Sequence, residues 1–324
     1  MSDDAAMVVS RDFERALGRA GLDQGRPVAL GCTSPSTGPL LWARGTLGPG
    51  RDLRPETPMY TASVTKQLIG VLIAQQVLAS RLSLDDQVIE VLPMLPIWAS
   101  PIQIHHLLHH TAGLPTTARL LAAAGVESEQ DLTNELVLYG LNRLSRPDIE
   151  PGSAFAYSNI GYVLLAEALA ASSGSTVPEL ARKMLFDPLG MTASRLAHES
   201  RPHPLTGVRT PETVGDGGWW ASAADLLIWL DALNCDYLGS NLTEMVQTRG
   251  HLADGTGLDY CWGITARPGR RGTSYTHGGN WPGWSAKTVR QPNTKTAVAL
   301  LTLDDDVEAV SQAATDLHAM LVAL

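Results

Sequence analysis

The sequence predicts an α/β fold, in which an antiparallel sheet is flanked by N- and C-terminal helices and carries an inserted, mostly helical lobe. Short strand patterns occur near both ends of the chain, over residues 26–48 and again from Gly257. Helical patterns dominate from Leu82 to about Ala197. Because both ends supply strands to one sheet, the helical segment is an insertion, and a pocket is expected between the two lobes.

These patterns define a single domain over residues 10–324, made of an α/β lobe (about 10–80 and 215–324) and a helical lobe (about 81–214). A chain of 324 residues with 44% hydrophobic and 18% charged residues is typical of a globular protein with a sizeable core. No apolar run reaches the roughly 18–20 residues of a membrane-spanning helix. The net charge of −9, with no basic cluster, argues against nucleic acid as a partner.

The first elements are an amphipathic helix within residues 1–21 and a strand pair, 26–34 and 38–48, joined by a tight turn. Residues 63–80, SVTKQLIGVLIAQQVLAS, are strongly apolar without regular polar spacing. This composition predicts a helix that is buried on all sides.

Later elements have clearer boundaries. Thr176 and Glu179 have the spacing of a helix N-terminal capping box, with a proline in the first turn. A final helix is expected from about Val307 to Leu321. Between them, four short strands are expected in the segments LDYCWGITA, SYTHGG, SAKTVRQ and TAVALLTLD.

Two features concern the cellular compartment. Residues 1–21 open with acidic side chains and lack the basic start, apolar stretch and cleavage site of a signal peptide. Cys32, Cys235 and Cys261 are odd in number and widely spaced, which indicates reduced thiols with no disulfide framework and no metal-ligand spacing. We therefore expect a cytoplasmic protein with no membrane partner, and the oligomeric state is left open.

The first candidate site is YTASVTK, residues 60–66, in which Ser63 precedes Lys66 by one helical turn. Most cationic positions of the chain hold arginine, and lysine occurs only at Lys66, Lys183, Lys287 and Lys295. Lysine, unlike arginine, can give up its proton. If the buried helix begins near Ser63, the helix N-terminus favours negative charge on the serine oxygen, and the amine three residues later lies on the same face. An ordinary surface lysine is the alternative.

A second segment, residues 151–162 (PGSAFAYSNIGY), places Tyr157 and Asn159 in a loop just before a helix. A tyrosine beside a lysine ammonium can shuttle a proton. An amide two residues later can hold the lysine or orient a substrate carbonyl. The alternative is a core tyrosine followed by a helix-capping asparagine.

A third segment, SYTHGGNWPGW, places His277 on a strand directly before Gly278 and Gly279. Glycines at such a point let a substrate lie against the strand edge. The backbone N–H of Asn280 could then pair with that of Ser63 as an oxyanion hole. A plain turn is the alternative.

The order Ser-x-x-Lys, Tyr-x-Asn, His-Gly-Gly resembles the motif order of the class C β-lactamase-like serine hydrolases. Segments 107–115 (LLHHTAGLP), 186–194 (FDPLGMTAS) and 215–230 (GDGGWWASAADLLIWL) are also similar to that family, so the resemblance extends from about residue 10 to the C-terminus. The family includes class C β-lactamases, certain carboxylesterases, D-aminopeptidases, DD-peptidases and acyltransferases.

The resemblance implies that Ser63 is the acylated nucleophile, Lys66 its proton partner and Tyr157 the general base. It also implies that Asn159 orients the substrate and that the N–H groups of Ser63 and Asn280 form the oxyanion hole. No cofactor is implied, and the expected partner is a small ester, amide or acyl substrate. Hydrolysis, of the esterase or D-amino-acid peptidase type, is expected; acyl transfer from the same intermediate in a biosynthetic pathway and a non-catalytic binder or sensor are the alternatives.

One departure from the family concerns His277. Class C β-lactamases and most penicillin-binding proteins begin this motif with lysine, which places a fixed cation beside the carboxylate of a penicillin. Histidine, with an ordinary pKa of about 6.5, is mostly neutral at neutral pH. Hydrolysis of β-lactams is therefore not expected.

Four tryptophans are candidates for the walls of the pocket. Trp219 and Trp220 follow a glycine-rich turn, while Trp281 and Trp284 flank the third motif. Aromatic walls favour an apolar or aromatic acyl group or leaving group. For Trp219 and Trp284, packing between the lobes is the alternative.

The segment HHLLHH raises a competing hypothesis, because His105 with His109 and His106 with His110 have the spacing of helical zinc ligands. A zinc protease motif would also need a glutamate directly after the first histidine and a third ligand. Since the next residues are His106 and Leu107, no metal site is expected. The family resemblance makes His110 part of a structural turn.

Overall fold

The computed structural model describes residues 13–22 and 25–323. The expected first helix is present over residues 13–19, and the rest of that expectation, like residues 10–12 of the expected domain, lies outside the described residues. A six-stranded antiparallel sheet has the order β2-β1-β9-β8-β7-β6. Its strands are β1 (Val28–Ser34), β2 (Gly38–Arg44), β6 (Thr265–Arg267), β7 (Ser274–Trp281), β8 (Trp284–Gln291) and β9 (Thr296–Thr302). Both ends of the chain therefore build one sheet, which confirms the α/β prediction.

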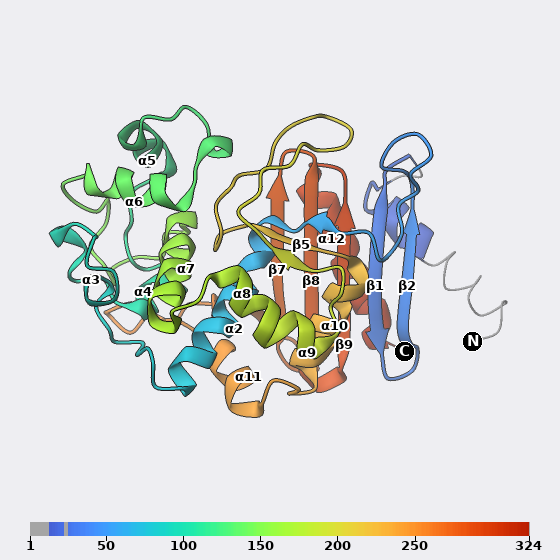
Figure 1. Ribbon diagram of the computed structural model, residues 1–324. Coiled ribbons are helices and arrows are strands. Elements are labelled where there is room, and N and C mark those ends of the chain that lie inside the picture. The colour runs from blue at the N-terminus through green and yellow to red at the C-terminus, as the bar shows by residue number, and fades with distance from the viewer. Residues whose placement is uncertain (1–12, 23–24, 324) are drawn as a thin grey trace.

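The helices lie on the two faces of this sheet and beyond one of its edges (Figure 1). The inserted segment supplies α3 (Val88–Val91), α4 (Ile104–Leu108), α5 (Thr117–Ala124), α6 (Asn134–Asn142), α7 (Asn159–Ser173), α8 (Val177–Ala181) and α9 (Asp187–Leu189). The others are α2 (Thr65–Leu78), α10 (Ala223–Asn234), α11 (Ser240–Val246) and α12 (Val307–Ala323). Short 3-10 turns cover Ala62–Val64 (η1), Ile97–Ala99, Glu129–Asp131 and Pro292–Thr294, and Arg182–Phe186 forms a π-helical turn.

Two hydrophobic clusters lie on the two faces of the sheet. Alternate residues of β9 divide between them: Val298 and Leu300 pack with α12, whereas Ala299 and Leu301 join the cluster that contains α2, α7 and α10. Strands β1 and β9 are buried along their whole length, because they are central and covered on both faces.

Helix α2 runs through the middle of the molecule, and its residues from Thr65 to Ala74 are all buried. This confirms the buried helix that the apolar run predicts. Among the described residues, no single helix is long and apolar enough to cross a membrane; only α7 with Val177–Leu189, a pair bent by 78°, reaches the required length and composition.

Two local features differ from the sequence-based expectations. The segment LDYCWGITA forms a strand only at its end, where β6 begins at Thr265, and the preceding residues make a loop that lines the site described below. A second, three-stranded sheet of β3 (Met59–Tyr60), β5 (Trp219–Ala221) and β4 (Arg195–Leu196) was not expected. It matters for the site because it ties the glycine-rich turn before Trp219 to the chain just before Ser63.

Candidate active site

Ser63 lies in the 3-10 turn η1, which leads directly into α2. The preceding residue, Ala62, has a left-handed φ of 46°, a conformation that costs a non-glycine residue about 1 kcal/mol. Two hydrogen bonds hold the turn: Thr65 Oγ1 donates to the Ala62 carbonyl at 2.7 Å, and Thr61 Oγ1 donates to the Trp219 carbonyl at 2.8 Å. The serine is thus presented by a constrained turn at the start of a helix.

The side chain of Lys66 is fully buried beneath this turn. Its Nζ lies 3.0 Å from Ser63 Oγ, 2.9 Å from Asn159 Oδ1 and 3.1 Å from the Asp216 carbonyl oxygen. An ammonium has three N–H donors, and each finds an acceptor here. A neutral amine fits equally well, with two N–H groups on the fixed oxygens and its lone pair toward the serine hydroxyl. The geometry can therefore both supply and accept a proton at Ser63 Oγ.

Tyr157 is 47% exposed and lies over the same lysine, with Lys66 Nζ 5.1 Å from the centroid of its ring. Its loop is held by His110, whose Nδ1 accepts from the Ser158 N–H at 3.1 Å and whose carbonyl accepts from the Ala156 N–H at 2.8 Å. Burial and the nearby Lys66 charge lower the pKa of His110 well below its usual value, so this support is neutral.

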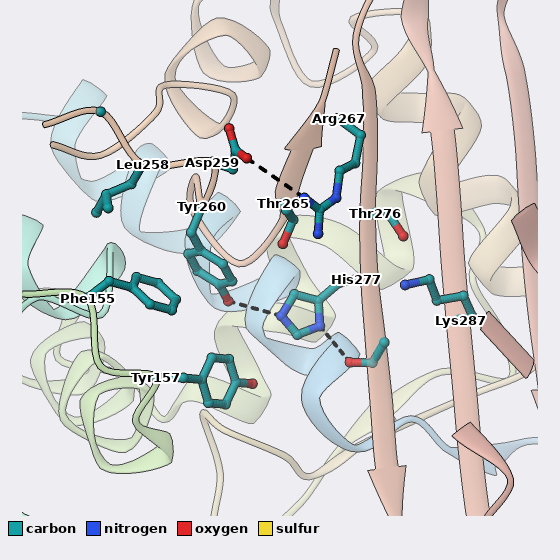
Figure 2. Close-up of a pocket in the computed structure, with 12 residues that line it drawn as sticks. Phe155, Tyr157, Leu258, Asp259, Tyr260, Thr265, Arg267, Thr276, His277 and Lys287 are labelled. Carbon is teal, nitrogen blue, oxygen red and sulfur yellow. Dashed lines mark hydrogen bonds and ion pairs between the residues drawn. The ribbon is translucent and has the colours of Figure 1, made fainter. Parts of the chain in front are cut away.

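His277 points from β7 toward the ring of Tyr260 (Figure 2). Its Nδ1–H donates to the Gly278 carbonyl at 2.6 Å, so its Nε2 accepts from the Tyr260 hydroxyl at 3.0 Å. Burial and, next, the Lys66 charge lower the pKa of His277 to about 3. The ring is therefore neutral across the physiological range, as the sequence predicts.

The two glycines after His277 have different functions. A Cβ at Gly279 would lie 1.9 Å from the Thr61 carbonyl oxygen and 3.1 Å from the Ser63 nitrogen, whereas a Cβ at Gly278 would make only ordinary contacts. Gly279 thus lets the nucleophile turn pack directly on β7. We expected both glycines to let a substrate approach β7 closely. That expectation did not include the packing of the Ser63 turn on β7, which requires glycine at position 279.

The edge of β7 beside Ser63 is open. On the side away from β8, β7 pairs only with β6, and only over residues 274–276. From His277 to Trp281, no strand of the described chain pairs on that side. Asn280 lies on this edge, with its side chain exposed, and the proposed oxyanion hole of its N–H and that of Ser63 stays a prediction. Such an edge can accept an extended substrate.

A cavity of about 580 Å³ adjoins this edge (Figure 2). Aromatic side chains form one wall and charged side chains the other. Its lining is Phe155, Tyr157, Gly257, Leu258, Asp259, Tyr260, Thr265, Arg267, Thr276, His277, Gly278 and Lys287. The cavity joins the third motif to Tyr157 and is large enough for a small-molecule substrate.

The expectation that the tryptophans line this cavity is wrong for Trp219. Its side chain is 0% exposed and packs between Phe186 and Trp229, with ring centroids 6.0 and 5.8 Å away. Trp220, on the opposite face of β5, lines a separate cavity of about 430 Å³, and Trp284 lines the same cavity. Trp281 is half-buried, and its Nε1–H donates to the Arg209 carbonyl at 2.8 Å instead of lining the cavity beside Tyr157.

Sequence reasoning missed three contributors. Asp216 supplies a backbone carbonyl to Lys66, Tyr260 donates to His277, and Lys287 lines the cavity. A signal for the first was present in GDGG, because a Cβ at Gly217 would lie 2.3 Å from the Tyr60 hydroxyl oxygen, so the turn needs glycine there.

The histidine cluster does not present a metal site. His105 Nε2 bonds to Gln103 Oε1 at 2.9 Å, His106 Nδ1 accepts from the Gln103 N–H at 3.1 Å, and His109 Nδ1 bonds to the Tyr260 carbonyl at 3.2 Å. Across residues 13–22 and 25–323, no group of three or more His, Cys, Asp or Glu side chains is placed to hold a metal ion. His105 and His106 thus bond to the residue that precedes α4, and His109 ties the helical lobe to the loop at Tyr260.

Comparison with known proteins adds independent findings. The family model described as Beta-lactamase matches residues 9–321. Penicillin-binding protein 4* of Bacillus subtilis (strain 168) is 26% identical over 294 residues, which are 80% of this chain and 63% of that protein. A D-aminopeptidase of Cereibacter sphaeroides (strain KD131 / KCTC 12085) is 24% identical over 280 residues, which are 80% of this chain and 53% of that protein. The chain thus spans between about half and two-thirds of the length of these relatives.

Solved structures share the fold at low sequence identity. The D-amino acid amidase from Ochrobactrum anthropi SV3, complexed with L-phenylalanine, aligns with a TM-score of 0.76 at 20% identity, over 97% of this chain and 98% of that one. The octameric penicillin-binding protein homologue from Pyrococcus abyssi aligns with a TM-score of 0.74 at 20% identity, over 100% of this chain and 78% of that one. At this identity the alignments establish the architecture alone.

Proposed function

The chain belongs to the beta-lactamase family, and from this premise we propose that it is a serine hydrolase that forms an acyl-enzyme on Ser63 with a small amide or ester. The contact between Lys66 Nζ and Ser63 Oγ, at 3.0 Å, carries the proposal. A fully buried lysine that bonds a serine and two fixed oxygens is arranged to activate that serine as a nucleophile.

The proposed reaction has two balanced steps. In acylation, Ser63 Oγ bonds to the substrate carbonyl carbon, the bond to the leaving nitrogen or oxygen breaks, and the serine proton passes to the leaving group through Tyr157. In deacylation, a water oxygen bonds to the same carbon, the bond to Ser63 Oγ breaks, and one water proton returns to the serine. Lys66 stays hydrogen-bonded to Ser63 Oγ throughout and favours its negative charge.

The proposed substrates are short amides or peptides of D-amino acids, with simple esters as further substrates. The names of two similar proteins, a D-aminopeptidase and a D-amino acid amidase, support this choice. The neutral His277 supports it too, because it offers no fixed cation at the third motif for the carboxylate of a β-lactam. Acyl transfer to an amine or alcohol is the competing outcome for the same intermediate, and a cytoplasmic location remains part of the proposal.

Product analysis tests this function. The wild type and Ser63→Ala are incubated with D- and L-alaninamide, D- and L-phenylalaninamide and p-nitrophenyl butyrate, each with and without added amine acceptors. We expect release of ammonia or nitrophenol by the wild type alone, faster from the D-amides than from the L-amides. Acylated acceptor as the main product would favour the transferase. A ligand-induced rise in Tm without turnover of any of these compounds would favour the non-catalytic binder.

A further inference from the structure

A second cavity, of about 430 Å³, lies against Trp220 and Trp284. It shares no lining residue with the cavity beside Tyr157. Its walls come from the loop between β2 and β3, from β4 and the loop that follows β4, and from the two tryptophans, whose rings pack edge to face with centroids 5.5 Å apart. The volume is that of a small-molecule site. None of the residues proposed for catalysis lines it, so this cavity is a separate candidate for ligand binding.

The lining of this second cavity is cationic. Among the residues that the structure describes, it contains Arg51, Arg195 and Arg201 and no aspartate or glutamate, whereas the whole chain has a net charge of −9. His203 also lines the cavity. Burial lowers the pKa of this histidine, against an opposing effect of Asp305, so its ring is mostly neutral at neutral pH. Cations gathered in a cavity in this way attract anions.

Two of these arginines are held in place by contacts within the protein. The guanidinium carbons of Arg195 and Arg201 lie 4.9 and 5.7 Å from the centroid of the Trp220 ring, within the range of a cation–π contact. The Nε–H groups of both arginines donate to the carboxylate of Glu199. Their terminal nitrogens have no hydrogen-bond acceptor in the described part of the chain. Both guanidinium groups are therefore oriented in advance, with their terminal N–H groups available to a ligand.

Arg51 brings a third guanidinium group to the cavity from the loop between β2 and β3. Its backbone carbonyl accepts from the Leu47 N–H at 2.8 Å and from Thr46 Oγ1 at 3.0 Å, which fixes this part of the loop. Its side chain has no hydrogen bond or ion pair with any residue that the structure describes. Three arginines less the one carboxylate of Glu199 leave a charge of +2 for a ligand to balance.

We propose that this cavity binds a small molecule that carries a phosphate monoester, with the phosphate oxygens on Arg51, Arg195 and Arg201. A phosphate monoester has a charge of about −1.5 to −2 at pH 7, which matches the charge of the site, whereas a carboxylate balances only half of it. Guanidinium groups also donate two parallel N–H bonds to phosphate. The cavity has room beyond the phosphate, where Leu47 and Pro58 offer apolar contacts to the organic part. The inference goes beyond the proposed hydrolysis and does not depend on it.

Calorimetric titration with phenyl phosphate, benzoate and inorganic phosphate tests the charge of the ligand. Phenyl phosphate and benzoate share the ring and differ in the anion. We expect phenyl phosphate to bind at least about tenfold more tightly than benzoate, and its affinity to fall as the salt concentration rises. Inorganic phosphate should bind more weakly than phenyl phosphate, because it leaves the apolar wall uncovered. Equal affinity for phenyl phosphate and benzoate, or no binding of phenyl phosphate at millimolar concentration, overturns the proposal.

Single substitutions locate the bound anion. Arg51→Met and Arg201→Met should each weaken the binding of phenyl phosphate by roughly tenfold to a hundredfold, and Arg51→Lys by less. The matched control is Arg54→Met, which removes an exposed arginine of the same loop that does not line the cavity and should bind as the wild type does. An equal loss in Arg54→Met would reduce the effect to general surface charge and overturns the site.

Two further variants separate this cavity from the active site. Arg267→Met removes a cation from the cavity beside Tyr157 and should leave the binding of phenyl phosphate unchanged. Loss of binding in Arg267→Met, with Arg51→Met and Arg201→Met unaffected, would place the anion beside Tyr157 and overturns the proposal. Ser63→Ala should bind phenyl phosphate as the wild type does, so this test keeps its meaning even if the proposed hydrolysis is not found.

Discussion

The two lysines of the site, Lys66 and Lys287, lie in environments of opposite character. Lys66 is fully buried, and its Nζ has three hydrogen-bond partners, two fixed oxygens and the Ser63 hydroxyl. Lys287 is half-buried beside Arg267 and contacts no acceptor among the residues that the structure describes. Buried polar groups are almost always satisfied within the protein, so a saturated lysine is part of the framework. An unsatisfied lysine in a cavity is a group that a ligand can complete.

Removing Lys66 should have the largest effect on activity, and the size of this effect should not depend on the substrate. In Lys66→Met we expect kcat/KM to fall about 1,000-fold for every substrate, because the group that favours negative charge on Ser63 Oγ is lost. Asn159 Oδ1 and the Asp216 carbonyl also lose a partner, so the Tm should fall. Steady-state kinetics and thermal melts check both effects. Unchanged kcat/KM in a folded Lys66→Met would erase the distinction between the two lysines.

Separating β7 from the Ser63 turn at Gly279 should have the next largest effect on activity. In Gly279→Ala the added Cβ would lie 1.9 Å from the Thr61 carbonyl oxygen, which forces β7 away from the Ser63 turn. We expect kcat/KM to fall about 100-fold, as for a displacement of about 1 Å at a reacting group. The control is Gly18→Ala, where an added Cβ meets nothing within 4 Å. Equal activity of the two variants would show that contact between β7 and the turn is not required.

The neutral side chain of His277, on β7, predicts that the stability of the protein depends on pH. Its pKa is about 3 in the folded protein and about 6.5 when unfolded, so between these values the unfolded chain binds the extra proton. Stability from this residue is therefore present above pH 6.5 and is lost as the pH falls toward 3. Between pH 6.5 and 5, the wild type should lose about 2 kcal/mol more than His277→Gln in urea unfolding. Equal losses would mean that His277 titrates normally.

Removing the hydrogen bond that the Tyr260 hydroxyl donates to His277 should have the smallest effect on activity. Tyr260→Phe removes the bond from the tyrosine hydroxyl to His277 Nε2, while Nδ1 still donates to the Gly278 carbonyl. We expect a stability loss of about 1 kcal/mol. The value of kcat/KM should stay within about threefold of the wild type, which corresponds to less than 1 kcal/mol. A much larger fall in kcat/KM would place the Tyr260 hydroxyl in contact with the substrate.

Local spacing predicted the parts of the site that lie close together in sequence. Ser63 and Lys66 meet because they are three residues apart at the start of a helix. Tyr157 and Asn159 lie on either side of the residue that caps α7, which fixes their separation before any tertiary contact is known. The alternation of apolar residues and the turn signals likewise predicted the sheet that both ends of the chain share.

Contacts that depend on strand register could not be predicted in this way. Adjacent side chains of a strand face opposite sides, so Trp219 and Trp220 cannot both line one cavity. Trp219 packs between Phe186 and Trp229, whereas Trp220 lines a cavity. Lys287 reaches the cavity only because it pairs with Gly278, a register that no local pattern encodes. The Asp216 carbonyl belongs to the backbone, so its sequence signal is indirect, through the glycine that follows it in GDGG.

Intact-protein mass spectrometry during turnover of p-nitrophenyl butyrate tests the central claim most directly. We expect that the wild type, quenched early, carries one additional butyryl group on Ser63, and that Ser63→Ala carries none and releases no nitrophenol above background. Butyrylation of Ser63→Ala to the same extent, or nitrophenol release that does not depend on Ser63, would contradict the assignment of the nucleophile.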